Sequence, residues 1–229
     1  MEIRFVGTGG AFDVEYGNSS AIVNCHQKNI LIDCGHTVFP KLVQLNLIQS
    51  LDYILITHLH DDHAGSLSTL IFYLYFNSPQ KKVKLLVPDK FYNELENYLN
   101  FSQKNVHQYI TFERLPAYIH AIDTFNRHYP NMQTFSYVFS EYQEHIVYSG
   151  DLNDASFLMK EVKNMNLKGK TTVFHDVTFN PLAKTAHAYY QDIEPFMKEY
   201  TIWGYHCNPK LKPKDCKLPL VIENPQFIY

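Results

Sequence analysis

The chain reads Thr57-His58-Leu59-His60-Asp61-Asp62-His63-Ala64-Gly65 directly after the apolar residues Tyr53-Ile54-Leu55-Ile56. Such an apolar run predicts a buried strand that ends at Thr57, with the polar residues turning back over its carboxyl end. His58 and His60 lie two apart on extended backbone, so their imidazoles point the same way and can bind one cation. Asp62 and His63 lie around the turn and suit a second cation. The stretch therefore predicts a site for two metal ions.

The stretch contains more ligand-type side chains than an ordinary loop does. A single exposed histidine usually has no function, and an isolated His-x-His pair would be weak evidence. Here four ligand-type side chains lie within six positions behind a buried strand. Without a cation they would repel protons and one another, which favours metal binding over solvated loop histidines.

The bulk composition limits the classes of protein that remain. With 229 residues, 45% of them hydrophobic, the chain can fill one core, so we expect a single domain over residues 1–229. A formal charge of -3 gives no basic field for a large nucleic acid. The one basic cluster, which we expect to be a solvated loop, comprises Lys210, Lys212, Lys214 and Lys217. The four cysteines lack Cys-x-x-Cys spacing, and neither a signal segment nor a membrane-spanning apolar run is seen, which favours a cytoplasmic protein.

Hydrophobic periodicity and turn residues place the expected elements along the chain. Strands are expected at 2–6, 19–24, 29–33, 53–56, 83–87, 106–112, 118–125, 135–139, 145–149, 171–174 and 200–205. Helices are expected at 38–47, 66–76, 89–99 and 157–165. The second helix is apolar on nearly every side, so its aromatic residues Tyr73, Tyr75 and Phe76 are expected to pack in the core.

The His-x-His-x-Asp-His pattern resembles the metallo-β-lactamase superfamily, and the resemblance runs through most of the chain. It implies an αββα sandwich, with two mixed β-sheets packed face to face, helices outside and the site at one edge. His128, Asp151 in Ser149-Gly150-Asp151, and His206 match further ligand positions. The implied ligands are His58, His60 and His128 for the first metal and Asp62, His63 and His206 for the second, with Asp151 bridging. This set has no thiolate and suits two Zn²⁺ per chain, although Mn²⁺ or Fe²⁺ could occupy it.

Two further motifs resemble the RNase Z branch of the superfamily. His175-Asp176-Val177-Thr178-Phe179 is similar to its His-Glu-Ala-Thr-Phe motif, with Asp in place of Glu. His187 matches the histidine that this branch places at the start of a helix. The resemblance implies that Asp176 and His187 act in catalysis near the leaving group. It also implies a catalytic part for Asp62, which binds a metal. Asp33 resembles the aspartate that lies beneath the metal loop, although it could instead only form a turn before Cys34-Gly35.

The opening Gly7-Thr8-Gly9-Gly10-Ala11-Phe12 and the short segment between His128 and Asp151 are most similar to phage anti-Pycsar phosphodiesterases. This implies a homodimer in the host cytoplasm that hydrolyses cyclic mononucleotides (cCMP and cUMP, and also cAMP and cGMP) to 5′-monophosphates and so counteracts antiphage signalling. No membrane or large nucleic-acid partner is expected. The alternatives are an RNase Z-type tRNA 3′-endonuclease without the usual arm, a different cyclic phosphodiesterase, a lactonase, or a protein that sequesters a cyclic nucleotide. An intact His187 and a full bridging set favour an enzyme over sequestration.

Overall fold

The computed structural model describes residues 1–229 and contains two mixed β-sheets, with strand orders β1-β2-β3-β4-β5-β6 and β11-β10-β9-β8-β7. The strands are β1 Glu2–Gly7, β2 Ser20–Cys25, β3 Lys28–Ile32, β4 Tyr53–Leu55, β5 Lys84–Leu86, β6 Thr111–Glu113, β7 Ile119–Asp123, β8 Phe135–Glu141, β9 Glu144–Tyr148, β10 Lys170–Asp176 and β11 Thr201–Tyr205. The α-helices are α1 Val38–Gln44, α2 Asp61–Ala64, α3 Leu67–Asn77, α4 Tyr92–Gln103, α5 Ala155–Asn164 and α6 Tyr190–Ile193. Short 3₁₀ turns occupy Ile48–Ser50, Asp89–Phe91, Val106–Gln108, Pro181–Ala183, Glu194–Lys198, Pro209–Leu211, Val221–Glu223 and Pro225–Phe227.

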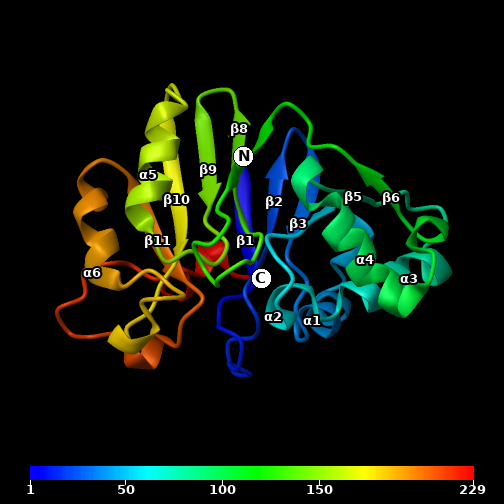
Figure 1. Ribbon diagram of the computed structural model, residues 1–229, viewed down its shortest axis with the longest axis horizontal. Coiled ribbons are helices and arrows are strands. Elements are labelled where there is room, and N and C mark those ends of the chain that lie inside the picture. Colours follow the sequence, from blue (N-terminus) through cyan, green and yellow to red (C-terminus); the bar gives the residue numbers. More distant parts are fainter.

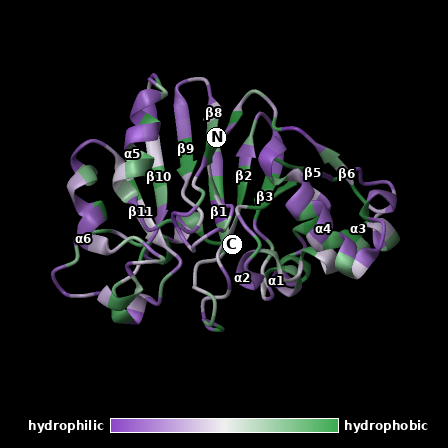
Figure 2. Cartoon of the chain, viewed as in Figure 1, coloured by the Kyte–Doolittle hydropathy of each residue, from purple (hydrophilic) through white to green (hydrophobic).

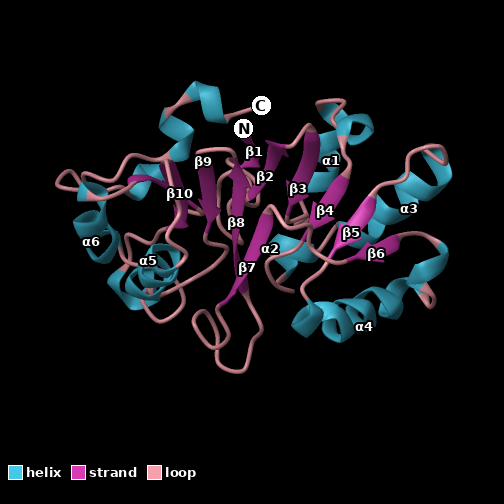
Figure 3. Ribbon diagram, turned by 90° about the horizontal axis from the view of Figure 1, so that it is seen from above, coloured by secondary structure: helices cyan, strands magenta, loops and turns pink.

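The two sheets are built in a mirrored way. Strands β1, β2 and β3 are antiparallel, and β3 to β6 are parallel. In the second sheet β7, β8 and β9 are antiparallel, and β9 to β11 are parallel. The helices α1, α3 and α4 accompany the first sheet, and α5 and α6 accompany the second (Figures 1 and 3). The expected αββα sandwich is confirmed.

Aromatic side chains join the two sheets in the core. The Phe5 ring of β1 lies 6.1 Å from the ring of Tyr148, 5.6 Å from that of Phe174 and 5.4 Å from that of Tyr205, all in the second sheet. The Tyr137 hydroxyl donates to the Ile56 carbonyl at 2.8 Å, so a buried polar group from β8 is satisfied at the end of β4. In Figure 2 the strands carry green stretches beside purple ones, and purple turns mark α4, α5 and α6. One core therefore fixes the relative position of the sheets.

Phe5→Ala should lower the free energy of unfolding by about 3–5 kcal/mol, because the fully buried ring would leave a cavity among three aromatic neighbours. Urea unfolding followed by circular dichroism measures the change. Phe76→Ala is the matched control: that ring is 67% exposed, and its removal should change stability by less than about 0.5 kcal/mol. Similar losses for both variants would contradict the assignment of Phe5 to the core.

Two expectations about the first half of the chain are corrected by the structure. The segment 106–112 begins with a 3₁₀ turn, because Asn100 Oδ1 accepts the Val106 N–H at 2.9 Å, and only Thr111–Glu113 pairs with β5. In α3 the buried side chains are Leu67, Leu70, Ile71 and Leu74. Tyr73 packs against the core as expected, but this single stripe leaves Tyr75 and Phe76 exposed, because one helix face is enough to cover the sheet.

The basic cluster and the cysteines are the other features that the sequence singles out. Lys210 pairs with Glu15 at 2.6 Å and Lys212 pairs with Glu223 at 2.8 Å, so half of the basic cluster is neutralised. All four cysteines are free. None of the helices has the length and apolar content that crossing a membrane requires.

Candidate metal centre

The loop after β4 is shaped by a short helix that begins directly behind His60. His60 is the extended N-cap of α2, and its carbonyl accepts the N–H groups of His63 and Ala64 at 2.9 Å each. Asp62 therefore lies in the first turn, where a carboxylate interacts favourably with the helix dipole. A Cβ on Gly35 would overlap the Asp62 carbonyl, so only glycine lets the backbone pass this close.

A first cluster gathers histidines from two distant parts of the chain. His60 Nδ1 lies 3.1 Å from His58 Nε2 and 3.0 Å from His128 Nε2. His128 Nε2 is 3.7 Å from Asp151 Oδ2. The three side chains expected at one metal are thus brought together with Asp151.

A second cluster lies against the same aspartate. His206 Nε2 is 3.3 Å from His63 Nε2 and 3.1 Å from Asp62 Oδ2. Asp151 Oδ1 lies 3.3 Å from His63 Nε2 and 3.5 Å from His206 Nε2. The structure therefore places Asp151 between the two clusters, one carboxylate oxygen toward each.

The spacing of these donor atoms fits bound cations. Donor atoms ~2.1 Å from one tetrahedral ion lie about 3.4 Å apart, close to the separations in both clusters. Asp151 Oδ1 is also buried without a hydrogen-bond partner, an arrangement that costs free energy unless a cation meets the oxygen. Gly150 lets Asp151 reach this point: its φ is +59°, and a Cβ there would lie 2.8 Å from the Phe135 carbonyl oxygen. The clusters together form a divalent-metal site.

Burial and charge hold His58, His60, Asp62 and Asp151 in the protonation states that coordination requires. Burial, helped by the neighbouring imidazoles, lowers the pKa of His58 and of His60, which keeps both rings neutral. Burial alone would raise the pKa of Asp151, but His206 and His63 outweigh it and hold the pKa well below its usual range. Burial alone would also raise the pKa of Asp62, but the hydrogen bonds from His206 and His63 and the charge of His63 outweigh it and lower the pKa. His63 differs: burial lowers its pKa, but the Asp151 and Asp33 carboxylates outweigh burial and raise the pKa, so a cation must displace a proton from this ring. Neutral imidazoles and ionised carboxylates are the forms that bind metal.

Asp33 is hydrogen-bonded to a ligand-type residue of the second cluster directly and to one of the first cluster through Thr57. Its Oδ2 accepts the Thr57 hydroxyl at 2.8 Å and His63 Nδ1 at 2.8 Å, and its Oδ1 accepts the Thr57 N–H at 2.7 Å. The Thr57 hydroxyl oxygen in turn lies 3.0 Å from His58 Nδ1. With Nδ1 of both histidines hydrogen-bonded, Nε2 is left free to face a metal. The structure thus favours the expected position of Asp33 under the loop and adds Thr57, which the sequence did not single out.

Asp33→Asn should weaken metal binding about 10- to 100-fold, because the amide has one acceptor oxygen where three donors converge. Chelator competition with a chromogenic indicator measures the affinity. The substitution keeps the shape of the side chain, and asparagine tolerates the left-handed backbone of this position, φ +63°. Unchanged affinity would mean that Asp33 serves only the turn.

The pair from the second motif lies beside the clusters. His187 Nδ1 is 2.7 Å from Asp176 Oδ2 and 3.8 Å from Asp151 Oδ2. Burial lowers the pKa of His187, but the Asp176 hydrogen bond and the Asp151 charge outweigh burial and raise the pKa to about 9; a cation at Asp151 would oppose this rise. The expected helix start is wrong: His187 lies in a turn, where its N–H donates to the Ala183 carbonyl at 3.0 Å, and α6 begins at Tyr190. The His187 ring is therefore oriented by its hydrogen bond with Asp176 and not by a helix start.

A cavity of about 430 Å³ opens over both clusters. The polar residues of its floor include His60, Asp62, His128, Asp151, His187 and His206, and the side chains Phe12, Tyr129, Phe179, Asn180, Asn208 and Leu211 line its walls. The wall asparagines cap 3₁₀ turns through Oδ1, which leaves their amide N–H groups as donors. Sequence reasoning missed these wall residues, because nothing local marks a side chain as lining a cavity built from several loops.

Solved structures with this fold define the class of protein. They include YhfI from Bacillus subtilis (TM-score 0.70, 15% identity, 90% of this chain and 85% of that one) and the short form of human tRNase Z (0.64, 18%, 92% and 93%). Zn²⁺-bound PqqB from Methylobacterium extorquens aligns with a TM-score of 0.66 at 9% identity over 92% of this chain and 91% of that one. The protein therefore has the metallo-β-lactamase fold.

The family follows from sequence comparison. A model of the family described as anti-Pycsar protein Apyc1 matches residues 1–220, so the chain belongs to that family. An anti-Pycsar protein Apyc1 from Paenibacillus harenae is 29% identical over 196 residues, which cover 77% of this chain and 76% of the relative. One from Bacillus phage BSP38 is 44% identical over 90 residues, 38% of this chain and 35% of the relative. The match to the phage protein thus spans about a third of its length.

Proposed function

We propose that the protein is a two-metal phosphodiesterase that converts 3′,5′-cyclic mononucleotides, pyrimidine ones included, to 5′-monophosphates. His58, His60 and His128 would hold one ion, and Asp62, His63 and His206 the other, with Asp151 shared. Zn²⁺ suits these nitrogen and oxygen donors, and Mn²⁺ or Fe²⁺ are the alternatives. As a member of the anti-Pycsar family, the chain would thereby remove a cyclic-nucleotide signal from the cytoplasm of an infected cell.

The cavity over the clusters is the observation that carries this proposal. Its volume of about 430 Å³ lies within the range of small-molecule sites and suits a single nucleotide. The segment between His128 and Asp151 consists of one loop and the β8–β9 hairpin, whose strands are paired within the second sheet. These features support a mononucleotide over a folded RNA.

Each reacting group has a candidate residue. Two bound cations would supply charge stabilisation on the phosphoryl oxygens and activate the attacking water. Water adds to phosphorus, and the bond from phosphorus to the ribose 3′-oxygen breaks, which leaves a 5′-monophosphate. His187 is only partly buried, with its side chain 22% exposed toward the cavity, and its Nδ1 is held by Asp176. Its Nε2 is therefore available to give a proton to the departing 3′-oxygen.

A panel of substrates tests the proposal. Purified metal-loaded protein is incubated with cCMP, cUMP, cAMP and cGMP, and in parallel with a precursor tRNA that carries a 3′ trailer, and the products are separated by chromatography. We expect 5′-monophosphates from the cyclic nucleotides and little cleavage of the trailer. Efficient trailer cleavage with intact cyclic nucleotides would instead identify a tRNA 3′-endonuclease. Tight binding without turnover would identify a sequestering protein.

The proposal includes the homodimer expected from the family resemblance. Sedimentation equilibrium should then give twice the chain mass of 26.8 kDa. A monomer at the enzyme concentrations of the assay would contradict this part alone and leave the chemistry untouched.

A further inference from the structure

Two large aromatic side chains at the mouth of the metal cavity are not used by the core. Phe12 is 98% exposed and Tyr129 is 60% exposed, and both line the cavity above His60 and Asp151. An aromatic ring left in water gains nothing from its apolar faces until another flat or apolar group covers them. Their position next to the reacting centre points to the substrate as that group.

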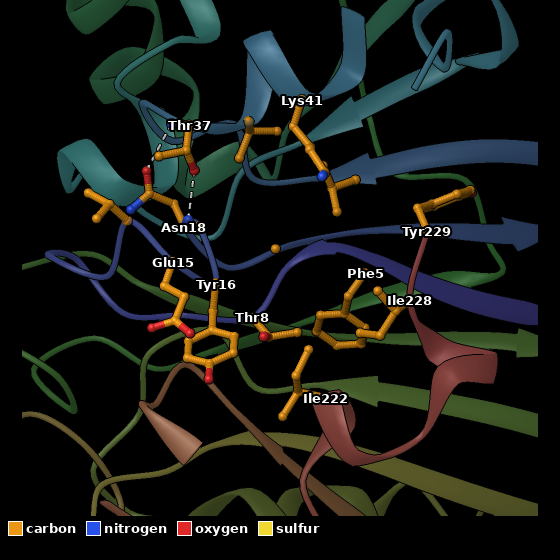
Figure 4. A pocket seen from close by; sticks show the side chains of 15 residues that line it. Phe5, Thr8, Glu15, Tyr16, Asn18, Thr37, Lys41, Ile222, Ile228 and Tyr229 are labelled. Atoms are coloured by element: carbon orange, nitrogen blue, oxygen red, sulfur yellow. Dashed lines mark hydrogen bonds between the residues drawn. The ribbon is translucent and has the colours of Figure 1, made fainter. Parts of the chain in front are cut away.

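Phe12 lies in a loop that is held by hydrogen bonds, and its ring does not pack into the core. Asp13 Oδ1 accepts the N–H groups of Glu15 and Tyr16 at 3.1 and 2.9 Å. At the end of the loop, Asn18 and Thr37 form two reciprocal hydrogen bonds of 2.7 and 3.0 Å, drawn in Figure 4 beside a second cavity of about 270 Å³. The loop is therefore held by its own polar contacts, and the Phe12 ring at its tip remains free to meet a ligand.

Tyr129 comes from a different part of the chain and is tied to the first cluster. It directly follows His128, and its ring centroid lies 6.3 Å from that of His60 in an edge-on arrangement. The carbonyl of Tyr129 accepts the Met132 N–H at 3.2 Å, so a turn begins there. The ring thus projects from the same short turn that carries a candidate metal ligand.

We propose that Phe12 and Tyr129 form the base-binding surface of the site: the nucleobase of a cyclic nucleotide stacks on these rings while its phosphate lies over the two clusters. This inference rests on the proposed function and adds the residues that bind the base. Stacking uses the π-face that every base possesses, so the surface accepts purines and pyrimidines alike. This surface binds the base, which takes no part in the reaction, and we therefore expect it to lower KM and leave kcat largely unchanged.

Steady-state kinetics on two matched substrates tests the proposal. One substrate is a 3′,5′-cyclic nucleotide, and the other is the methyl ribofuranoside 3′,5′-cyclic phosphate, which has the same ring and leaving group but no base. Phe12→Ala and Tyr129→Ala should each raise KM for the nucleotide by about 5- to 150-fold more than KM for the base-free analogue. Phe12→Tyr and Tyr129→Phe keep a ring and should restore most of the wild-type KM.

Phe101→Ala is the matched control, because that ring is 96% exposed but lies on α4, outside the cavity. Equal KM changes on both substrates, or no change on either, would overturn the proposal. So would a change in oligomeric state of the alanine variants in analytical ultracentrifugation, which would assign the rings to contact with a second copy. If the wild-type protein hydrolyses neither substrate, the proposed function fails. The calorimetric Kd values of the same two ligands would then decide the stacking question separately.

Discussion

Asp151→Ala is expected to lower kcat/KM for a cyclic nucleotide by at least about 10³-fold, because metal-derived charge stabilisation is worth several kcal/mol. Asp151 is the candidate ligand shared by both clusters, with Oδ1 near His63 and His206 and Oδ2 near His128. Its loss would remove the ligand shared by the two proposed ions and leave the imidazoles facing one another. Metal content measured by mass spectrometry on the same sample should fall with the rate.

The adjacent pair Asp61 and Asp62 provides the control for a carboxylate in this region. The Asp61 side chain is 76% exposed and lies 3.7 Å from His36, whereas Asp62 is buried against His206. Asp61→Asn should therefore keep its metal and its rate, while Asp62→Asn should lose both. Full metal content and a near-normal rate in Asp151→Ala would contradict the shared-ligand assignment.

His187→Ala is expected to reduce kcat on a cyclic nucleotide by about 10²- to 10⁴-fold, the usual contribution of a positioned acid. The ribose 3′-oxygen departs as a poor leaving group and needs a proton, whereas p-nitrophenolate does not. A p-nitrophenyl phosphodiester should therefore lose much less of its rate in the same variant. The ratio of the two rate losses measures how much His187 contributes by proton donation, because a general loss of structure would slow both substrates equally.

Asp176→Asn tests the partner of His187. Asp176 is buried at the end of β10 and acts through its 2.7 Å contact with His187 Nδ1, so the asparagine variant should show the same selectivity between leaving groups with a smaller loss. Equal losses on both substrates for His187→Ala would show that His187 positions the phosphate. Unaffected rates would remove the pair from the chemistry.

The local part of the metal centre could be predicted from sequence because its geometry is local. A strand that ends at Leu55, two residues before the predicted Thr57, and a short helix that begins at Asp61 place His58 and His60, and then Asp62 and His63, close together in one loop. His128 and His206 lie far away in sequence, and only the resemblance to a family assigned them. Residue spacing cannot show that two distant loops meet at one sheet edge.

Other features depended on competition between neighbouring groups. From its sequence, the segment 106–112 is expected to begin as a strand. Instead the Asn100 side chain, at the end of α4, accepts the Val106 N–H and stabilises a 3₁₀ turn. The ring of Phe76 stayed outside because α3 needs one apolar stripe, and hydrophobicity alone does not reveal which side faces the sheet. The wall of the cavity, with Phe12 and Tyr129, emerged only once four loops had been placed in space.

Hydrolysis of cCMP in water enriched in ¹⁸O tests the central claim most directly. The metal-loaded protein should yield 5′-CMP that carries one solvent oxygen on phosphorus, as mass spectrometry of the product would show, because water attacks phosphorus and the 3′-oxygen leaves. Recovery of unchanged cCMP, or of 3′-CMP in place of 5′-CMP, would contradict the account.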